Sequence, residues 1–231
     1  MNPLPFKPRY CVLIPAYQEE KNIASVVRDA LKYCPQVIVV DDGSGDKTAS
    51  VADQAGAIVH RHETNRGKGA ALQTGFAVAR ARECDAVITM DADGQHKPEE
   101  IPRFMDAYER TRIPVLVGNR MADPAGMPLI RRLTNRFMSC MLSRVMKQYV
   151  PDTQCGFRLF ASDLTPFVPT ESAGFAAESE ILLYVARRGI RMDSVRVSTV
   201  YTGAEQSSIR PFSDAFRFFG MLWRNRERKR F

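Results

Sequence analysis

The sequence lacks a long apolar segment. It contains no run of about 18 consecutive apolar residues, the length that a membrane-spanning helix requires. Its first ten residues, MNPLPFKPRY, also lack the basic, apolar and small-residue regions of a signal peptide. We therefore expect a cytoplasmic protein.

The cysteines of the chain also form no recognisable disulfide or metal-binding motif. Its five cysteines are odd in number, and no two of them form a C-x-x-C pair. This spacing indicates neither a disulfide framework nor a zinc site. We expect reduced thiols in the core at Cys11, Cys34, Cys84, Cys140 and Cys155.

Two common phosphate-binding motifs are absent. No G-x-G-x-x-G follows the first expected strand, GKGAAL at 67–72 lacks the third glycine, and there is no G-x-x-x-x-G-K-[ST]. These absences argue against a Rossmann dehydrogenase and a P-loop NTPase. An EF-hand that begins at Asp91 and Asp93 is excluded as well, because Gly94 comes at the fourth position and Pro98 interrupts the loop.

The composition fits one domain with a basic end. The 231 residues are 45% hydrophobic, enough for one substantial core, and no internal repeat or low-complexity segment divides them. The formal charge is +7, and residues 207–231 carry +5 of it. Such a tail suits an anionic membrane surface or nucleic acid, and a solvated tail explains it equally well.

Short β-rich runs alternate with helical patterns in the first half. The pattern predicts an α/β fold with an open, mainly parallel sheet, in which ligands bind beyond the carboxyl ends of the strands. Beyond residue 120 the alternation breaks, which suggests an elaboration on the same domain. The expected strands are 10–14, 36–40, 57–59, 85–90 and 114–117, and the expected helices are 19–33, 46–55, 68–83 and 98–110.

Two of the expected strands end in acids. Asp91 and Asp93 can both turn toward Mg²⁺ or Mn²⁺ and leave room for substrate phosphates, and Gln95 or His96 can add a neutral ligand. Alternatively, these acids cap the next helix. The acids at 41–42, which end the second strand, favour a metal and a polar nucleotide at this edge.

Four segments together resemble the ordered motifs of family-2 glycosyltransferases with the GT-A fold, across residues 10–120: IPAYQEE at 14–20, VDDGSGD at 40–46, NRGKG at 65–69 and MDADGQH at 90–96. The resemblance implies a nucleotide-sugar donor and a divalent metal held by Asp91, Asp93 and Gln95. Independently, Arg66 and Lys68 sit near a helix N-terminus suited to anions, and ordinary surface charges at a helix start explain them equally well. The implied donor-binding residues are Pro15, Tyr17, Glu19, Asp42, Lys68, Asp91, Ala92, Asp93 and Arg210.

The acceptor half, 121–231, is similar to dolichyl-phosphate mannosyltransferases and other polyprenyl-phosphate glycosyltransferases. The similar segments are GNR at 118–120, DTQCGFRLF at 152–160, GFAAESE at 174–180 and VYTGAEQSS at 200–208. By this match the lipid phosphate is held by Arg120, Arg131, Arg132 and Arg158, and the catalytic residues are Asp93, Arg120 and Arg158. Arginine suits bidentate phosphate contacts.

Residues 129–147 form an amphipathic, basic pattern. Apolar residues recur every four positions beside four arginines, which fits either packing on the core or contact with a membrane. The aromatic residues between 212 and 223 repeat the pattern. This branch of the family often has C-terminal transmembrane helices and this chain ends without them, so we expect peripheral attachment, through these two helices or a membrane-anchoring partner protein. The first stripe consists of Leu129, Leu133, Phe137, Met141 and Val145.

The acceptor decides the mechanism. A polyprenyl phosphate is already anionic and needs no base. The metal and the arginines would position it for in-line attack on the anomeric carbon, which inverts the configuration there. A sugar hydroxyl needs one, and Glu178 is then the candidate, although Ser179 stands where related enzymes have an acid. We expect Glu180 to be structural. Two other possibilities are a non-catalytic nucleotide-binding subunit and a nucleic-acid binder; the acidic motifs and the lipid explanation of the charge argue against both.

Overall fold

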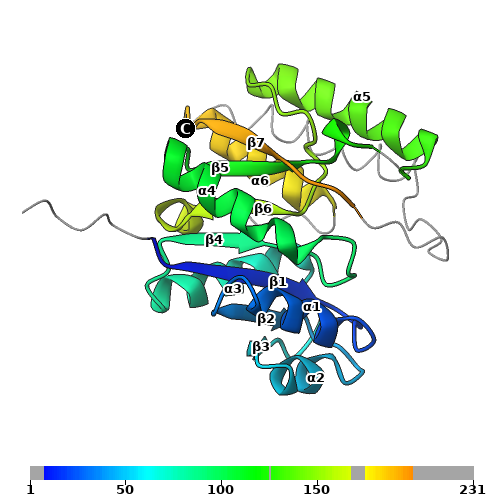
Figure 1. The fold of residues 1–231 in the computed structure, drawn as a ribbon, viewed down its shortest axis with the longest axis vertical. Helices are drawn as coiled ribbons and strands as arrows, with labels where there is room; N and C mark the ends of the chain where they lie inside the picture. Colours follow the sequence, from blue (N-terminus) through cyan, green and yellow to red (C-terminus); the bar gives the residue numbers. More distant parts are fainter. Residues whose placement is uncertain (1–7, 125, 168–174, 200–231) are drawn as a thin grey trace, which may run out of the picture.

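In the computed structural model, residues 8–124, 126–167 and 175–199 are described, apart from the side chains of 166–177. They form one seven-stranded sheet in the order β3-β2-β1-β4-β6-β5-β7 (Figure 1). β6 runs antiparallel to both of its neighbours, and the other pairings are parallel. The strands are β1 (Tyr10–Ala16), β2 (Val37–Asp41), β3 (Ile58–Arg61), β4 (Ala86–Thr89), β5 (Val115–Asn119), β6 (Arg158–Ala161) and β7 (Met192–Arg196).

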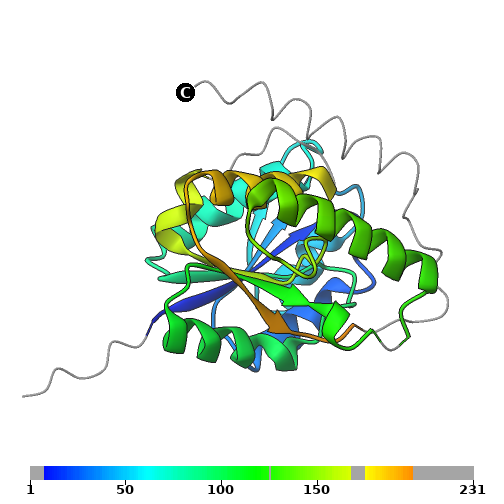
Figure 2. The same cartoon turned by 90° about the horizontal axis from the view of Figure 1, so that it is seen from above.

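Helices cover both faces of the sheet (Figure 2). α1 (Ile23–Leu31), α2 (Thr48–Gln54) and α4 (Ile101–Thr111) pack on one face. α3 (Lys68–Ala81), α5 (Leu129–Met146) and α6 (Phe175–Arg187) pack on the other. Three short 3-10 helices lie at Pro98–Glu100, Arg120–Ala122 and Ser162–Phe167.

The central strand β1 shows why these runs are apolar. Val12 and Ile14 pack with α1 and α4, whereas Cys11 and Leu13 pack with α3 and α6. All four side chains have no exposed surface. A parallel strand buried on both faces is apolar throughout, and burial removes about 25 cal/mol of unfavourable hydration per Å² of apolar surface.

The first half agrees with the sequence. All five expected strands and all four expected helical segments are present, with ends that differ by a few residues. The second half returns to the same sheet: β6 inserts between β4 and β5, and β7 pairs with β5. The expectation of one α/β domain with a mainly parallel sheet is confirmed.

All five cysteines are free thiols, and four of them are buried as expected. Cys140 on α5 is exposed, so the expectation of a core thiol was wrong for this residue. It was wrong because this face of α5 is turned away from the core. None of the described helices is both long and apolar enough to cross a membrane.

Candidate active site

A cleft of about 310 Å³ opens beside the carboxyl ends of β1, β2 and β4. Loops that follow these strands and the first residues of α3 form its walls. Arg210, one of the expected donor-binding residues, lies outside the described residues. The structure brings the other eight together as lining of this cleft: Pro15, Tyr17, Glu19, Asp42, Lys68, Asp91, Ala92 and Asp93.

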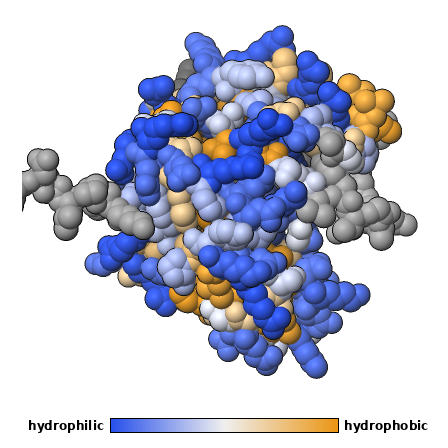
Figure 3. Space-filling view, in the orientation of Figure 1, coloured by the Kyte–Doolittle hydropathy of each residue, from blue (hydrophilic) through white to orange (hydrophobic). Residues whose placement is uncertain are grey.

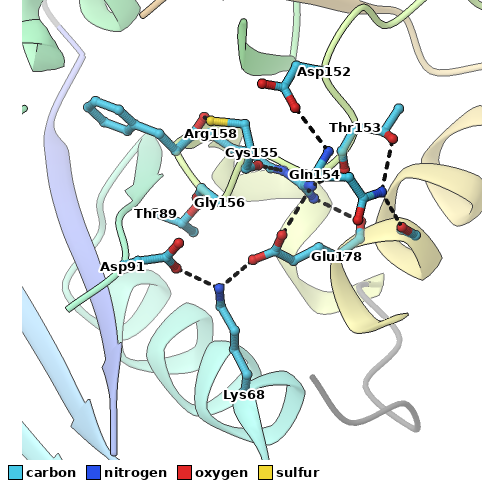
Figure 4. Close-up of polar contacts among 12 residues, drawn as sticks. Lys68, Thr89, Asp91, Asp152, Thr153, Gln154, Cys155, Gly156, Arg158 and Glu178 are labelled. Atoms are coloured by element: carbon cyan, nitrogen blue, oxygen red, sulfur yellow. Dashed lines mark hydrogen bonds and ion pairs between the residues drawn. The ribbon is translucent and has the colours of Figure 1, made fainter. Parts of the chain in front are cut away.

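Lys68 joins the two halves of the site (Figure 4). It is the first residue of α3, and its Nζ donates to Asp91 Oδ1 at 2.5 Å and to the carboxylate of Glu178. Asp91 follows β4, and Glu178 lies in the first turn of α6. A single ammonium group therefore links the strand-end acids to the acceptor half.

The pKa values of Lys68 and Asp91 are shifted in opposite directions. Burial lowers the pKa of Lys68, but the charges of Asp91 and Glu178 outweigh it, and the net pKa lies above the usual lysine range. Burial raises the pKa of Asp91, but Lys68 and His96, whose Nε2 lies 3.1 Å from Asp91 Oδ2, bring it well below the usual range. Both residues therefore carry their charges at neutral pH.

Within the described residues, no side-chain cation pairs with Asp93 as Lys68 pairs with Asp91. Its pKa is raised, first by burial and then by the charge of Asp91, and its Oδ1 accepts from the backbone N–H of Gln95 at 2.9 Å. Two carboxylates that lose solvation beside one another are stabilised by a divalent cation. Within the described residues no three His, Cys, Asp or Glu side chains cluster as metal ligands. Asp91, Asp93 and Gln95 nevertheless fit Mg²⁺ or Mn²⁺, which commonly take one or two carboxylates together with substrate phosphates.

The guanidinium group of Arg158 does not face the cleft. The side chain is 2% exposed, and its guanidinium donates to the backbone oxygens of Cys155, Thr153 and Glu178 at 2.7–2.9 Å. It also lies 3.6 Å from Glu178 Oε2. This burial leaves almost no exposed surface for a lipid phosphate. The geometry therefore argues against the phosphate-binding and catalytic roles expected for Arg158 and gives it a role in holding Glu178.

Arg120 is tied in a similar way. Its Nε and Nη2 donate to the two oxygens of Asp152 at 2.7 and 2.9 Å, and Asn135 of α5 donates to the same carboxylate. Burial raises the pKa of Asp152, but Arg120 outweighs it and the net pKa is lowered. Arg120 is 7% exposed, so a phosphate would have to approach through a narrow opening or displace this pair.

The remaining expected arginines lie on α5. Arg131 is half-buried, and its Nη2 lies 3.5 Å from Gln95 Oε1, which places it beside the candidate metal ligands. Arg132 is exposed. Of the arginines proposed for the acceptor phosphate, Arg131 therefore has the most direct approach to the cleft.

Asp42 has a role that the sequence did not reveal. Its carboxylate accepts from His62 Nδ1 at 2.7 Å and from the backbone N–H groups of Arg66 and Gly67 at 3.0 and 2.7 Å. His62 also lies 2.9 Å from Thr74 Oγ1 on α3. Asp42 thus fixes the loop that leads into α3 and turns the N-terminus of that helix toward the cleft. No sequence pattern marked His62.

Gly156 was also missed. A Cβ atom at this position would lie 2.6 Å from Asp91 Oδ2, so only glycine leaves room for this carboxylate in its present position. Thr89 Oγ1 donates to the backbone oxygen of Gly156 at 2.8 Å and fixes the approach. In the segment 152–160 the resemblance singles out Arg158, but it is the glycine that shapes the acidic site.

The chain is similar in sequence to several known proteins. The family model described as glycosyl transferase family 2 matches residues 11–165. A UDP-N-acetylglucosamine--dolichyl-phosphate N-acetylglucosaminyltransferase of Methanococcus voltae is 29% identical, over 83% of this chain and 85% of its own. An undecaprenyl-phosphate mannosyltransferase of Micrococcus luteus is 28% identical, over 83% of this chain and 84% of its own.

A solved structure matches the fold. Glucosyl-3-phosphoglycerate synthase from Mycobacterium tuberculosis, in complex with Mn²⁺, UDP and phosphoglyceric acid, has a TM-score of 0.72 and 20% identity to this chain. The match covers 93% of this chain and 77% of the other. At this identity the likeness shows the fold alone, and the expected GT-A fold is confirmed.

Proposed function

This chain belongs to glycosyl transferase family 2, and from that membership we propose that it moves a hexose from a nucleotide-sugar donor to a polyprenyl phosphate at a membrane surface. The chain is a glycosyltransferase. We further propose its donor, its metal, its acceptor and the stereochemistry of the transfer. The observation that carries it is the ion pair of Lys68 with Asp91, two residues before Asp93, in the cleft that holds every described donor-binding candidate.

The donor half of the cleft suits a nucleoside diphosphate. The loop held by Asp42 directs the backbone N–H groups at the start of α3 toward the cleft, and a helix N-terminus attracts phosphate. Lys68 stands at the same point with its ammonium charge. The half-exposed ring of Tyr17 lines the other wall, where a base or ribose can lie against it. These features support diphosphate binding between α3 and the acids after β4.

Asp91, Asp93 and Gln95 would hold a divalent cation, Mg²⁺ or Mn²⁺. When bound, the cation neutralises negative charge on the donor diphosphate as it leaves. The raised pKa of Asp93, caused by burial and by Asp91, supports this assignment, because a cation would relieve that repulsion. Lys68 remains available to donate to a phosphate oxygen.

The acceptor half favours an acceptor that is already ionised. Glu178 is 4% exposed and is bound by Lys68 and by Arg158, so its oxygens are occupied by cations. Lys68 contacts one oxygen of Glu178 and Arg158 contacts the other, so neither oxygen is free to reach a sugar hydroxyl. This arrangement argues against the alternative in which Glu178 deprotonates a sugar hydroxyl. A phosphate oxygen needs no such base.

The proposed step is an in-line displacement. A phosphate oxygen of the lipid, positioned by Arg131 and Arg132, attacks the anomeric carbon and forms the new C–O bond. The bond between that carbon and the donor diphosphate breaks, and the nucleoside diphosphate leaves with the electron pair. Attack from the side opposite the leaving group inverts the anomeric configuration. The two relatives named above act on dolichyl phosphate and undecaprenyl phosphate, which supports this class of acceptor.

A transfer assay tests the proposal. Labelled GDP-mannose, UDP-glucose and UDP-N-acetylglucosamine are each offered with polyprenyl phosphate in detergent and with Mg²⁺ or Mn²⁺. We expect label from one donor in an organic-extractable product, and no such product with Asp93→Asn. The proposed acceptor would be contradicted if the wild-type enzyme formed no lipid product with any donor but glycosylated a sugar hydroxyl.

A further inference from the structure

Helix α5 has its amphipathic faces reversed. The side that packs on the domain contains the polar residues Asn135 and Ser139 as well as Leu142 and Met146, and all four are buried. Asn135 donates to Asp152 at 2.9 Å, and the Ser139 hydroxyl lies 3.1 Å from that of Thr153. Hydrogen bonds therefore fix much of the inner face, and of the five residues of the apolar stripe Met141 alone packs against the core.

The apolar stripe faces outward instead. Met141 is partly buried against the core, whereas the other four side chains of the stripe are 52–67% exposed. In Figure 3 an apolar patch is visible at the upper right, over the end of the molecule where α5 lies. Four exposed apolar residues in the first turns of α5 are called the outer face of α5 below. They are Leu129 (67% exposed), Ile130 (71%), Leu133 (59%) and Phe137 (58%). Clustered apolar exposure of this kind marks an interaction surface.

The charge around the outer face has one sign. Residues 129–147 contain five basic residues and no acid. Arg132, Arg136 and Arg144 are exposed beside the apolar residues. A second copy of the chain would bring these like charges together, which opposes self-association through this face. An anionic surface with an apolar interior matches both the charge and the stripe.

The outer face also lies next to the candidate site. Arg131 is followed immediately along the helix by Arg132 and Leu133, and its guanidinium lies 3.5 Å from Gln95 Oε1. The start of α5 therefore connects the acidic end of the cleft with the exposed apolar residues. A lipid whose phosphate reaches the cleft would have its chain leaving beside this helix.

We propose that the outer face of α5 docks onto an anionic lipid bilayer, with the four apolar side chains in the headgroup region and Arg136 and Arg144 near lipid phosphates. The proposal rests on the proposed function only for the lipid nature of the acceptor. Membrane contact at this helix orients the cleft toward the headgroups, where a polyprenyl phosphate presents its charge.

Vesicle co-sedimentation of the full chain tests the docking. The vesicles contain phosphatidylcholine with or without phosphatidylglycerol, and neither polyprenyl phosphate nor sugar donor is present. We expect wild type to bind the anionic vesicles and Ile130→Ser/Leu133→Ser to lose at least about tenfold in affinity, because two side chains no longer bury apolar surface. Tyr33→Ser, which follows α1 at the other end of the molecule and is 40% exposed, serves as the matched control and should bind like wild type.

A second variant separates charge from apolar contact. Arg136→Gln/Arg144→Gln should lose about thirtyfold in affinity for anionic vesicles, since each basic residue near such a surface contributes about 1 kcal/mol. Arg28→Gln/Arg80→Gln removes two exposed arginines on α1 and α3 and keeps the same net charge as the first variant. This control variant should lose much less affinity for anionic vesicles.

Several outcomes would overturn the proposal. One is wild type that does not bind anionic vesicles; another is α5 variants that bind like wild type, as they would if residues 200–231 carried the binding. A wild-type dimer that Ile130→Ser/Leu133→Ser converts to a monomer, without a change in vesicle binding, would assign the face to self-association. Transfer to polyprenyl phosphate in detergent should be unchanged in both α5 variants, so failure of docking is distinguishable from failure of the proposed function.

Discussion

Lys68 Nζ lies 2.5 Å from Asp91 Oδ1, so an ammonium group of the protein occupies one of the carboxylates that we assign to a divalent cation. Glu178 holds the same ammonium from the other side. The Lys68 side chain is therefore a counter-ion of Asp91 within the protein. With metal and donor present, the same ammonium can turn to the donor diphosphate.

Replacing Lys68 by Met should change metal and nucleotide binding in opposite directions. Without the ammonium, the charge of Asp91 is uncompensated, and Mn²⁺ alone should bind about tenfold more tightly. The nucleoside diphosphate in the presence of Mn²⁺ should bind about tenfold more weakly, because one phosphate contact is lost. Titration of Mn²⁺ by electron paramagnetic resonance and calorimetry with GDP or UDP measure both. Lys47→Met, an exposed lysine, is the control. Weaker binding of both ligands would contradict the counter-ion role.

Replacing Glu178 by Gln distinguishes a positioning residue from a base. If Glu178 holds Lys68, the KM for the donor should rise about fivefold or more while kcat falls little and its pH profile keeps its shape. A catalytic base would give the reverse, a large loss of kcat with donor binding intact. Steady-state kinetics over a pH series decide between them.

Replacing Gly156 by Ala should damage the acidic site selectively. The added methyl would lie 2.6 Å from Asp91 Oδ2 and must displace that carboxylate. Displacing metal ligands through a neighbouring residue typically costs about 10–100-fold in metal affinity, so we expect Mn²⁺ binding to weaken in that range. Gly45→Ala is the matched control, because a Cβ at Gly45 meets no atom within 4 Å. Unchanged Mn²⁺ binding in Gly156→Ala would contradict the assignment of Asp91 as a metal ligand.

Stability at low pH should depend on Asp152. Burial raises the pKa of this carboxyl, but Arg120 outweighs it, so the pKa in the folded state lies below the unfolded value of about 3.9. Its contribution to stability is therefore present above the unfolded pKa and is lost as the pH falls through the folded pKa.

Asp152→Asn should accordingly be less stable than wild type at pH 7, by about 3 kcal/mol, because it leaves Arg120 buried without a charged partner. The difference should shrink as the pH falls below about 5. Urea unfolding at several pH values measures it, with Asp53→Asn, an exposed acid on α2, as the control. A difference that stays constant from pH 7 to pH 3 would contradict the assignment.

The sequence predicted the donor half because its signals are local. β1, β2 and β4 are apolar runs buried on both faces, and acids stand directly where β2 and β4 end. In a parallel sheet such ends meet at one edge, so strand order along the chain was enough to bring Asp42, Asp91 and Asp93 together. The structure gathers them in one cleft, as the pattern predicted.

The structure of the acceptor half was harder to predict from the sequence because it depends on contacts between residues far apart in the chain. β6 pairs antiparallel with β4, which lies about seventy residues earlier, and no local pattern announces that insertion. Arg120 and Arg158 looked like phosphate ligands by motif, yet a sequence does not show that Asp152 and three backbone oxygens take up their hydrogen bonds. The stripe of α5 was visible, but its direction depends on what Asn135 and Ser139 contact inside the domain.

The linkage in the product tests the central claim most directly. After reaction with the accepted donor, ³¹P NMR and mass spectrometry of the organic extract should show a polyprenyl phosphate converted from a monoester to a glycosyl phosphodiester, with the anomeric configuration opposite to that of the donor. Asp93→Asn should leave only the monoester. A sugar attached through a hydroxyl group, or a retained configuration at the anomeric carbon, would contradict the account.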